Sequence, residues 1–142
     1  MRISKRGLYA LEALTMLARE HSSGTLKIHD IAETEGIPQK FLELILLSLK
    51  NARLVESVRG VHGGYRLKRP PSEIFLGEII RTIDGPLAPL GDAETLRVLV
   101  KRDKQHSALY QVQLDVRNAA AGNLDHTSLA DLCHTAARRR QD

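Results

Sequence analysis

Residues 28–67 have the sequence IHDIAETEGIPQKFLELILLSLKNARLVESVRGVHGGYRL, and this stretch decides the fold. Apolar residues recur at helical spacing on both sides of a Gly36-Ile37-Pro38 break, first over 28–35 and then to about residue 53. Gly36 suits the left-handed residue that ends a helix, and Pro38 suits the first turn of the next, where its missing N–H costs little. The pattern therefore predicts two short helices joined by a tight turn.

A helix-turn-helix needs a small residue where its helices cross, a glycine at the turn and apolar anchors on both sides. The chain supplies this set in order as Ile31, Ala32, Gly36, Ile37, Leu42 and Ile45. Helical hairpins of other kinds show the same spacing. The segments 54–58 and 65–68, which read as two strands around a glycine-rich tip, favour a winged helix-turn-helix.

Polar residues occupy the two places where a winged helix meets DNA, the start of the second helix and the hairpin. The candidates in the second helix are Gln39, Lys40 and Glu43, suited to adenine, to guanine or phosphate, and to cytosine N4 respectively. In the hairpin, Arg59 suits a narrow minor groove, and the turn glycines are Gly60, Gly63 and Gly64.

Several of these candidates have a plainer alternative. Lys40 and Glu43 also fit a surface ion pair three residues apart, worth only tenths of a kcal/mol. Arg59 fits an ordinary solvated charge, and His62 at the tip either touches phosphate or is idle. Lys5 and Arg6, near the start of the first helix, are candidate phosphate contacts.

The segments outside 28–67 also have helical patterns. A helix over about 4–20 is capped by Ser4 and is expected to bury Leu8, Leu11, Leu14, Leu17 and Ala18. A short helix ends near Gly85, and helices follow over 92–105, with Leu96, Leu99 and Val100 buried, and over 107–123. A capping-box-like sequence at 128–131 starts a last helix. The fold class is therefore mainly α with a small β-hairpin wing.

The helix over 107–123 carries a coiled-coil-like stripe of Leu109, Val112, Val116 and Ala120. Such a stripe either packs within one chain or pairs with its copy in a dimer, and the pattern leaves both open. We expect residues 1–86 to form a winged helix-turn-helix DNA-binding domain and residues 87–142 to form a helical dimerisation or sensor region.

Composition and charge exclude several classes of protein. The 142 residues are 42% hydrophobic and 27% charged, and no apolar run approaches a membrane span. The basic N-terminus lacks the apolar stretch of a signal peptide, so we expect a cytoplasmic protein. Residues 1–69 contain 12 Lys or Arg against 7 acids, a net +5 that suits a polyanion or is merely a basic surface.

Common catalytic and metal-binding patterns do not occur in the sequence. There is no nucleophile with a neighbouring base, no phosphate-binding glycine loop and no His pair at a typical ligand spacing, so we expect no enzyme activity. The single cysteine, Cys133, excludes an internal disulfide and any all-cysteine metal site within one chain. It fits a small buried apolar residue, and a redox role stays open.

Several motifs together resemble the Rrf2 family of bacterial winged-helix transcription regulators, the group of IscR, NsrR and CymR. They are MRISKRGLYA at 1–10, GIP at 36–38, LVESVRG at 54–60, GGYRL at 63–67, DGPL at 84–87 and TSLADL at 127–132. The resemblance implies a homodimer that binds a palindromic operator, commonly as a repressor, with the long helix crossing its partner. It also implies base reading by Glu43 and a DNA contact by Arg59.

Many members of this family bind an iron–sulfur cluster through three cysteines, but residues 91–105 here contain none. We therefore expect a cluster-free member with no cofactor, controlled by a small molecule, a partner protein or its own abundance. The alternative function is a winged-helix module that binds only another protein; Lys40, Arg59 and the charge of +5 argue against it.

Overall fold

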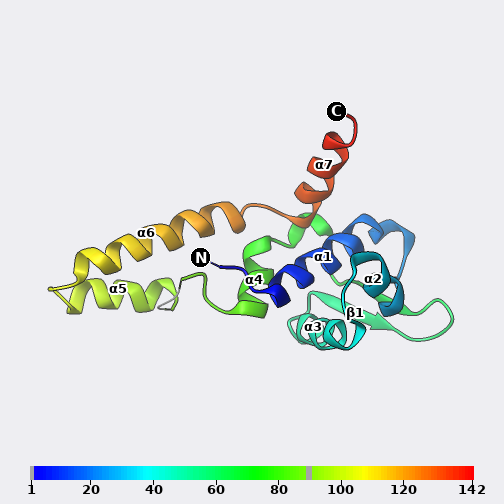
Figure 1. Ribbon diagram of the computed structural model, residues 1–142, viewed down its shortest axis with the longest axis horizontal. Coiled ribbons are helices and arrows are strands. Elements are labelled where there is room, and N and C mark those ends of the chain that lie inside the picture. The colour runs from blue at the N-terminus through cyan, green and yellow to red at the C-terminus, as the bar shows by residue number, and fades with distance from the viewer. Residues whose placement is uncertain (1, 89–90) are drawn as a thin grey trace.

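The computed structural model describes residues 2–88 and 91–142, and within them the chain is mainly helical with one β-hairpin (Figure 1). This confirms the predicted fold class. The elements are α1 (Lys5–Arg19), a 3₁₀ turn (His21–Ser23), α2 (Ile28–Glu35), α3 (Gln39–Asn51), β1 (Val55–Val58), β2 (Gly64–Leu67), a second 3₁₀ turn (Pro71–Glu73), α4 (Leu76–Asp84), α5 (Ala93–Arg102), α6 (Ser107–Leu124) and α7 (Leu129–Arg139).

Helix α1 is the centre of the molecule and packs against α2, α3, α4, α7 and β2. Ser4 caps it as predicted, because its hydroxyl accepts a hydrogen bond from the Gly7 amide at 2.9 Å. Ala10, Ala13 and Leu14 are fully buried. The prediction that Leu8 is buried was wrong: it is 48% exposed, because the core meets α1 on the side of its alanines.

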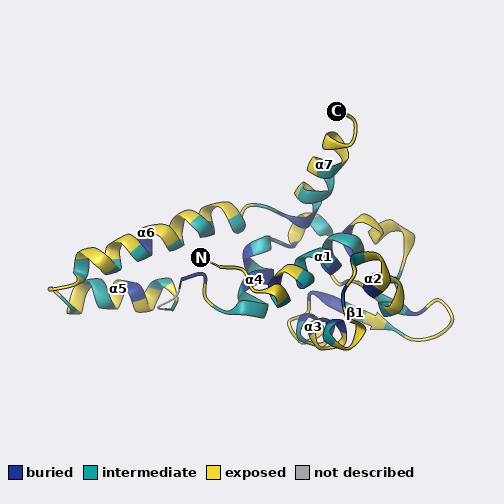
Figure 2. Cartoon of the chain, in the orientation of Figure 1, coloured by how far each residue is buried: buried dark blue, intermediate teal, exposed yellow. Residues whose placement is uncertain are grey.

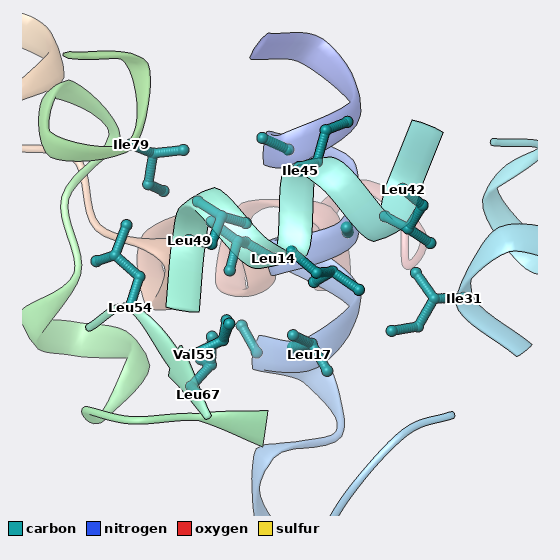
Figure 3. Packing of buried hydrophobic residues seen from close by; sticks show 14 of the residues in the cluster. Leu14, Leu17, Ile31, Leu42, Ile45, Leu49, Leu54, Val55, Leu67 and Ile79 are labelled. Atoms are coloured by element: carbon teal, nitrogen blue, oxygen red, sulfur yellow. The ribbon is translucent and has the colours of Figure 1, made fainter. Parts of the chain in front are cut away.

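The turn between α2 and α3 forms as the sequence predicts. Gly36 adopts a left-handed conformation with φ of 65°, and the Ile37 amide donates to the Ala32 carbonyl at 2.9 Å. Pro38 lies one residue earlier than expected, at the N-cap of α3. Ile31 from α2 and Leu42 from α3 are both fully buried, and Figure 3 shows them facing each other in the core.

The hairpin is antiparallel, with Val55 paired to Leu67 and Val58 paired to Gly64. Its inner face contributes Val55 and Leu67 to the core beside α1 (Figure 3). On its outer face Arg66 and Glu56 form an ion pair with 2.6 Å between Nε and Oε1. The tip of the hairpin extends away from the body, at the right of Figure 1.

Helices α5 and α6 form an antiparallel pair that extends from the other side of the body (Figure 1). Their small core contains Ala88, Leu96 and Leu114. Leu99 and Val100 were expected to be buried with Leu96, but this core is too narrow and they are half-buried.

The α5–α6 pair is joined to the body by the buried Ile80, Leu87 and Ala121 and by a bidentate ion pair. Arg81 of α4 donates to both carboxylate oxygens of Asp125, at 2.6 and 2.9 Å. Hydrogen bonding to this guanidinium lowers the pKa of Asp125. A Cβ at Gly77 would overlap the Asp125 carboxylate, so the glycine makes room for the ion pair.

Helix α7 begins with the predicted capping box, in which Ser128 and Asp131 bond each other's backbone amides. Leu129 is fully buried in the core that contains α1, and α7 packs against α1. The expected boundary between two domains at residue 86 stays a prediction. Helix α7, which lies after this boundary, packs into the core of residues 1–86. Within the described residues, no helix is both long enough and apolar enough to span a membrane.

Candidate nucleic-acid interface

Helix α3 has one face in the core and one face in solvent. Its buried face consists of Leu42, Ile45, Leu46 and Leu49. Gln39, Lys40 and Glu43 are all exposed, and Figure 2 shows the outward side of α3 in the colour of exposed residues. None of the ion pairs among residues 2–88 and 91–142 joins Lys40 to Glu43, so the expected alternative of a surface pair is not formed.

The two basic residues at the start of α1 differ in their surroundings. Lys5 is exposed, with Nζ 5.7 Å from the centre of the Tyr9 ring. Arg6 is half-buried and donates from one guanidinium nitrogen to the hydroxyl of Ser48 on α3, at 2.8 Å. This bond fixes α3 against α1. Arg6 therefore positions α3, a role that the sequence did not suggest, and its other nitrogens stay available to an anion.

The tip of the hairpin presents Arg59 and His62 to solvent. Gly60 has φ of 108°, a conformation that side-chain-bearing residues rarely adopt, and the Gly63 amide donates to its carbonyl at 3.0 Å. A Cβ at Gly63 would lie 2.4 Å from the Val58 carbonyl oxygen. The glycines thus close a tight tip that carries Arg59. Among the described residues, Arg59 has no ion-pair partner.

A residue that sequence reasoning missed holds the hairpin in place. The hydroxyl of Thr25, between α1 and α2, lies 2.6 Å from the His62 carbonyl oxygen and 3.1 Å from that of Gly63. The next residue, Leu26, exchanges two backbone hydrogen bonds with Tyr65, at 2.9 and 2.7 Å. A Cβ at Gly64 would lie 2.4 Å from the Leu26 carbonyl oxygen, so only glycine allows this close approach. No local pattern around Thr25 signals these contacts.

The stripe on α6 lies outside the core of this chain. Leu109, Val112 and Val116 are 55%, 58% and 54% exposed, and Ala120 is half-buried. Helix α6 uses other residues, Leu114 and Ala121, against α5 and the body. The sequence allowed the stripe either to pack within one chain or to pair with its copy in a dimer. In the structure, the stripe is not packed within the chain.

The described residues offer few ligands for an iron–sulfur cluster. Within the described residues, no group of three His, Cys, Asp or Glu side chains is arranged to hold a metal ion. Cys133 packs half-buried against the core from α7, and burial raises the pKa of its thiol. His106, at the start of α6, lies with Nδ1 3.0 Å from Oδ2 of Asp103. One protonated thiol is a poor ligand set where clusters are held by several thiolates.

Comparisons with known proteins agree with this geometry. The model of the Rrf2 family, described as "Iron-dependent Transcriptional regulator", matches residues 3–135. The HTH-type transcriptional regulator CymR of Bacillus subtilis is 36% identical over 132 residues, which are 93% of this chain and 89% of that protein.

Solved structures show the same likeness. The solved structure of CymR of B. subtilis superposes with a TM-score of 0.81 at 32% identity, covering 95% of this chain and 98% of that chain. The IscR of T. potens superposes with a TM-score of 0.67 at 32% identity, covering 96% and 88%.

Replacing Thr25 by Val tests the attachment of the hairpin. The variant keeps the shape but removes the hydroxyl, so we expect a loss of about 1 kcal/mol in the free energy of unfolding. Amide hydrogen exchange over residues 59–66 should become faster, as mass spectrometry would show. The matched control is Thr127→Val, whose hydroxyl bonds the Asn123 carbonyl on α6. Unchanged exchange in the hairpin of Thr25→Val would contradict the assignment.

Proposed function

The chain belongs to the Rrf2 family of transcriptional regulators, and on this premise we propose that it is a repressor that binds a palindromic operator as a homodimer. The observation that carries the proposal is that Gln39, Lys40 and Glu43 are exposed at the start of α3, while Thr25 holds the tip of the hairpin in place. A recognition helix must expose base-contacting side chains on one face while its other face stays packed in the core, and α3 meets both conditions. We propose that such a protein acts in the cytoplasm, where its DNA lies.

We assign the two DNA-contacting elements different tasks. Gln39, Lys40 and Glu43 lie at the start of α3, the part of a recognition helix that contacts base edges. In this proposal Glu43 selects bases in the major groove, and Lys40 and Gln39 add contacts to bases or phosphates. Arg59, at the tip of the hairpin, enters the minor groove next to the major groove that α3 occupies. His62, Lys5 and Arg6 face the phosphates.

Replacing Arg59 by Ala should weaken operator binding by about 1 to 3 kcal/mol, because an arginine in the minor groove loses its contact. The operator is first obtained by selecting bound fragments of genomic DNA, and binding is then measured by fluorescence anisotropy at stated salt. Arg97→Ala, which removes the same charge from an exposed residue of α5, is the control and should bind normally. Glu43→Gln should change base preference more than affinity. Equal affinities of Arg59→Ala and the control would refute the role of Arg59.

The exposed stripe on α6 supports the homodimer. Leu109, Val112 and Val116 present branched apolar side chains at the spacing of a helix–helix interface, and Ala120 leaves room for close approach. A second copy related by a two-fold axis would cover the stripe with the same residues. The two α3 helices would then read two half-sites, which accounts for a palindromic operator. On this proposal residues 1–86 bind DNA and residues 87–142 contribute dimerisation.

Replacing Val112 by Glu should convert the dimer to a monomer, because a carboxylate would be buried against its own copy. Light scattering coupled to size-exclusion chromatography measures this directly, and operator affinity should fall with it. The control is Asn118→Glu, which adds the same charge to an exposed residue on another side of α6. A Val112→Glu protein that stays dimeric would remove the stripe from the interface.

We also propose that this member works without an iron–sulfur cluster, although the family description names iron. The support is the ligand set, with one cysteine that packs against the core. Protein purified after anaerobic expression should be colourless, with no stoichiometric iron or sulfide. A visible absorption band with matching iron and sulfide content would show the opposite, and its loss in Cys133→Ala would identify the ligand.

The second candidate function is a winged-helix module that binds only a partner protein. Fragment selection separates it from the first, because such a module would enrich no DNA. A repressor should instead lose affinity steeply as salt rises, since counterions released from DNA drive binding. In either case we propose control by a small molecule, by a partner protein or by the protein's own abundance, and neighbouring genes would narrow the choice.

A further inference from the structure

Two leucines lie on the solvent side of α3, among its polar residues. Leu44 is 59% exposed and Leu47 is 53% exposed, whereas the leucines on the opposite side of the helix are fully buried. At 100° per residue, Leu44 and Leu47 fall on the same side as Lys40 and Glu43. The reading face of α3 is therefore not purely polar. Neither leucine belongs to the hydrophobic clusters of the described residues.

The position of Leu44 determines what can reach it. It directly follows Glu43 and lies one helical turn after Lys40, in the first half of α3. Leu47 lies nearly one turn further along the same side. If the start of α3 enters a major groove, as proposed above, Leu44 enters with it, and Leu47 lies behind it.

The charges around the leucines favour DNA over an apolar protein surface. Lys40 and Lys50 flank them on the same helix, and the guanidinium of Arg6 is bonded to Ser48 next to Leu47. Glu43 is the one acid on α3, so cations outnumber acids around the two leucines. This setting suits a surface that is mostly anionic and hydrogen-bonding but carries small apolar spots. The major groove is such a surface, and its apolar spots are the C5-methyl groups of thymine.

We propose that Leu44, supported by Leu47, contacts a thymine methyl group in the major groove and so favours an A·T pair at that position of each half-site. The inference rests on the proposed DNA-binding function and names a specificity residue within it. A leucine makes no hydrogen bond, so the discrimination comes from covering one methyl group. Removing that methyl group should weaken binding about fourfold, the value for one buried methylene-sized group.

Deoxyuridine provides the test, because it differs from thymidine only in lacking the C5-methyl group. Sites are first selected from a random duplex library with the full-length protein, and each thymine of the selected site is then replaced singly by deoxyuridine. Wild-type protein should lose about fourfold in affinity at one thymine per half-site. Leu44→Ala should bind the thymine site more weakly and lose less than about twofold on the same replacement.

Two further variants control the result. Leu44→Met keeps an apolar side chain of similar volume and should retain the sensitivity to deoxyuridine. Val98→Ala shortens another exposed apolar residue, on α5, and should behave as wild type. All these positions are exposed, so the substitutions should leave the fold intact, which far-ultraviolet circular dichroism checks.

The outcomes separate the inference from the function on which it rests. If the protein selects a site but no deoxyuridine weakens binding, or if Leu44→Ala keeps the full sensitivity, the inference is wrong and the DNA-binding function stands. If the two leucines bind a protein partner instead, no deoxyuridine replacement should weaken DNA binding, and Leu44→Ala should bind DNA with wild-type affinity. If no sequence is enriched at all, the proposed function itself fails.

Discussion

The packing of α1 against four other helices and β2 is the constraint on which the rest of the structure depends. Ala10 and Ala13 are fully buried and present only methyl groups, so the neighbouring elements can approach α1 closely. Larger side chains at these positions would push the neighbours outward, at a typical cost of 1 to 3 kcal/mol. The direction in which α3 presents its exposed face is thus set from the centre of the molecule.

Hydrogen bonds also fix α3 and the hairpin, the two elements that we propose contact DNA, in the free protein. Arg6 holds the later half of α3 to α1 through Ser48, and Lys50 of α3 donates to the Ser57 hydroxyl on β1 at 2.9 Å. Thr25 holds the tip of the hairpin from the other side. Because these elements are already ordered, binding need not spend free energy on ordering them.

The fold could be predicted largely because its signals are local. The cap at Ser4, the left-handed Gly36 and the capping box at 128–131 each involve residues within a few positions of one another. The contacts of Thr25 could not be predicted, since its partner His62 is 37 residues away. The exposure of Leu8 could not be predicted either, because a helical pattern of apolar residues does not show which of them the neighbouring elements cover.

The separation of α3 into a buried half and an exposed half has a consequence for how such proteins diverge. Side chains on the exposed half support no core contacts, and substitutions at such positions usually change stability by less than about 0.5 kcal/mol. Residues such as Glu43 and Leu44 can therefore be exchanged during evolution with little penalty to folding. One scaffold can acquire new target sites through a few codons, while its interior stays under selection for packing alone.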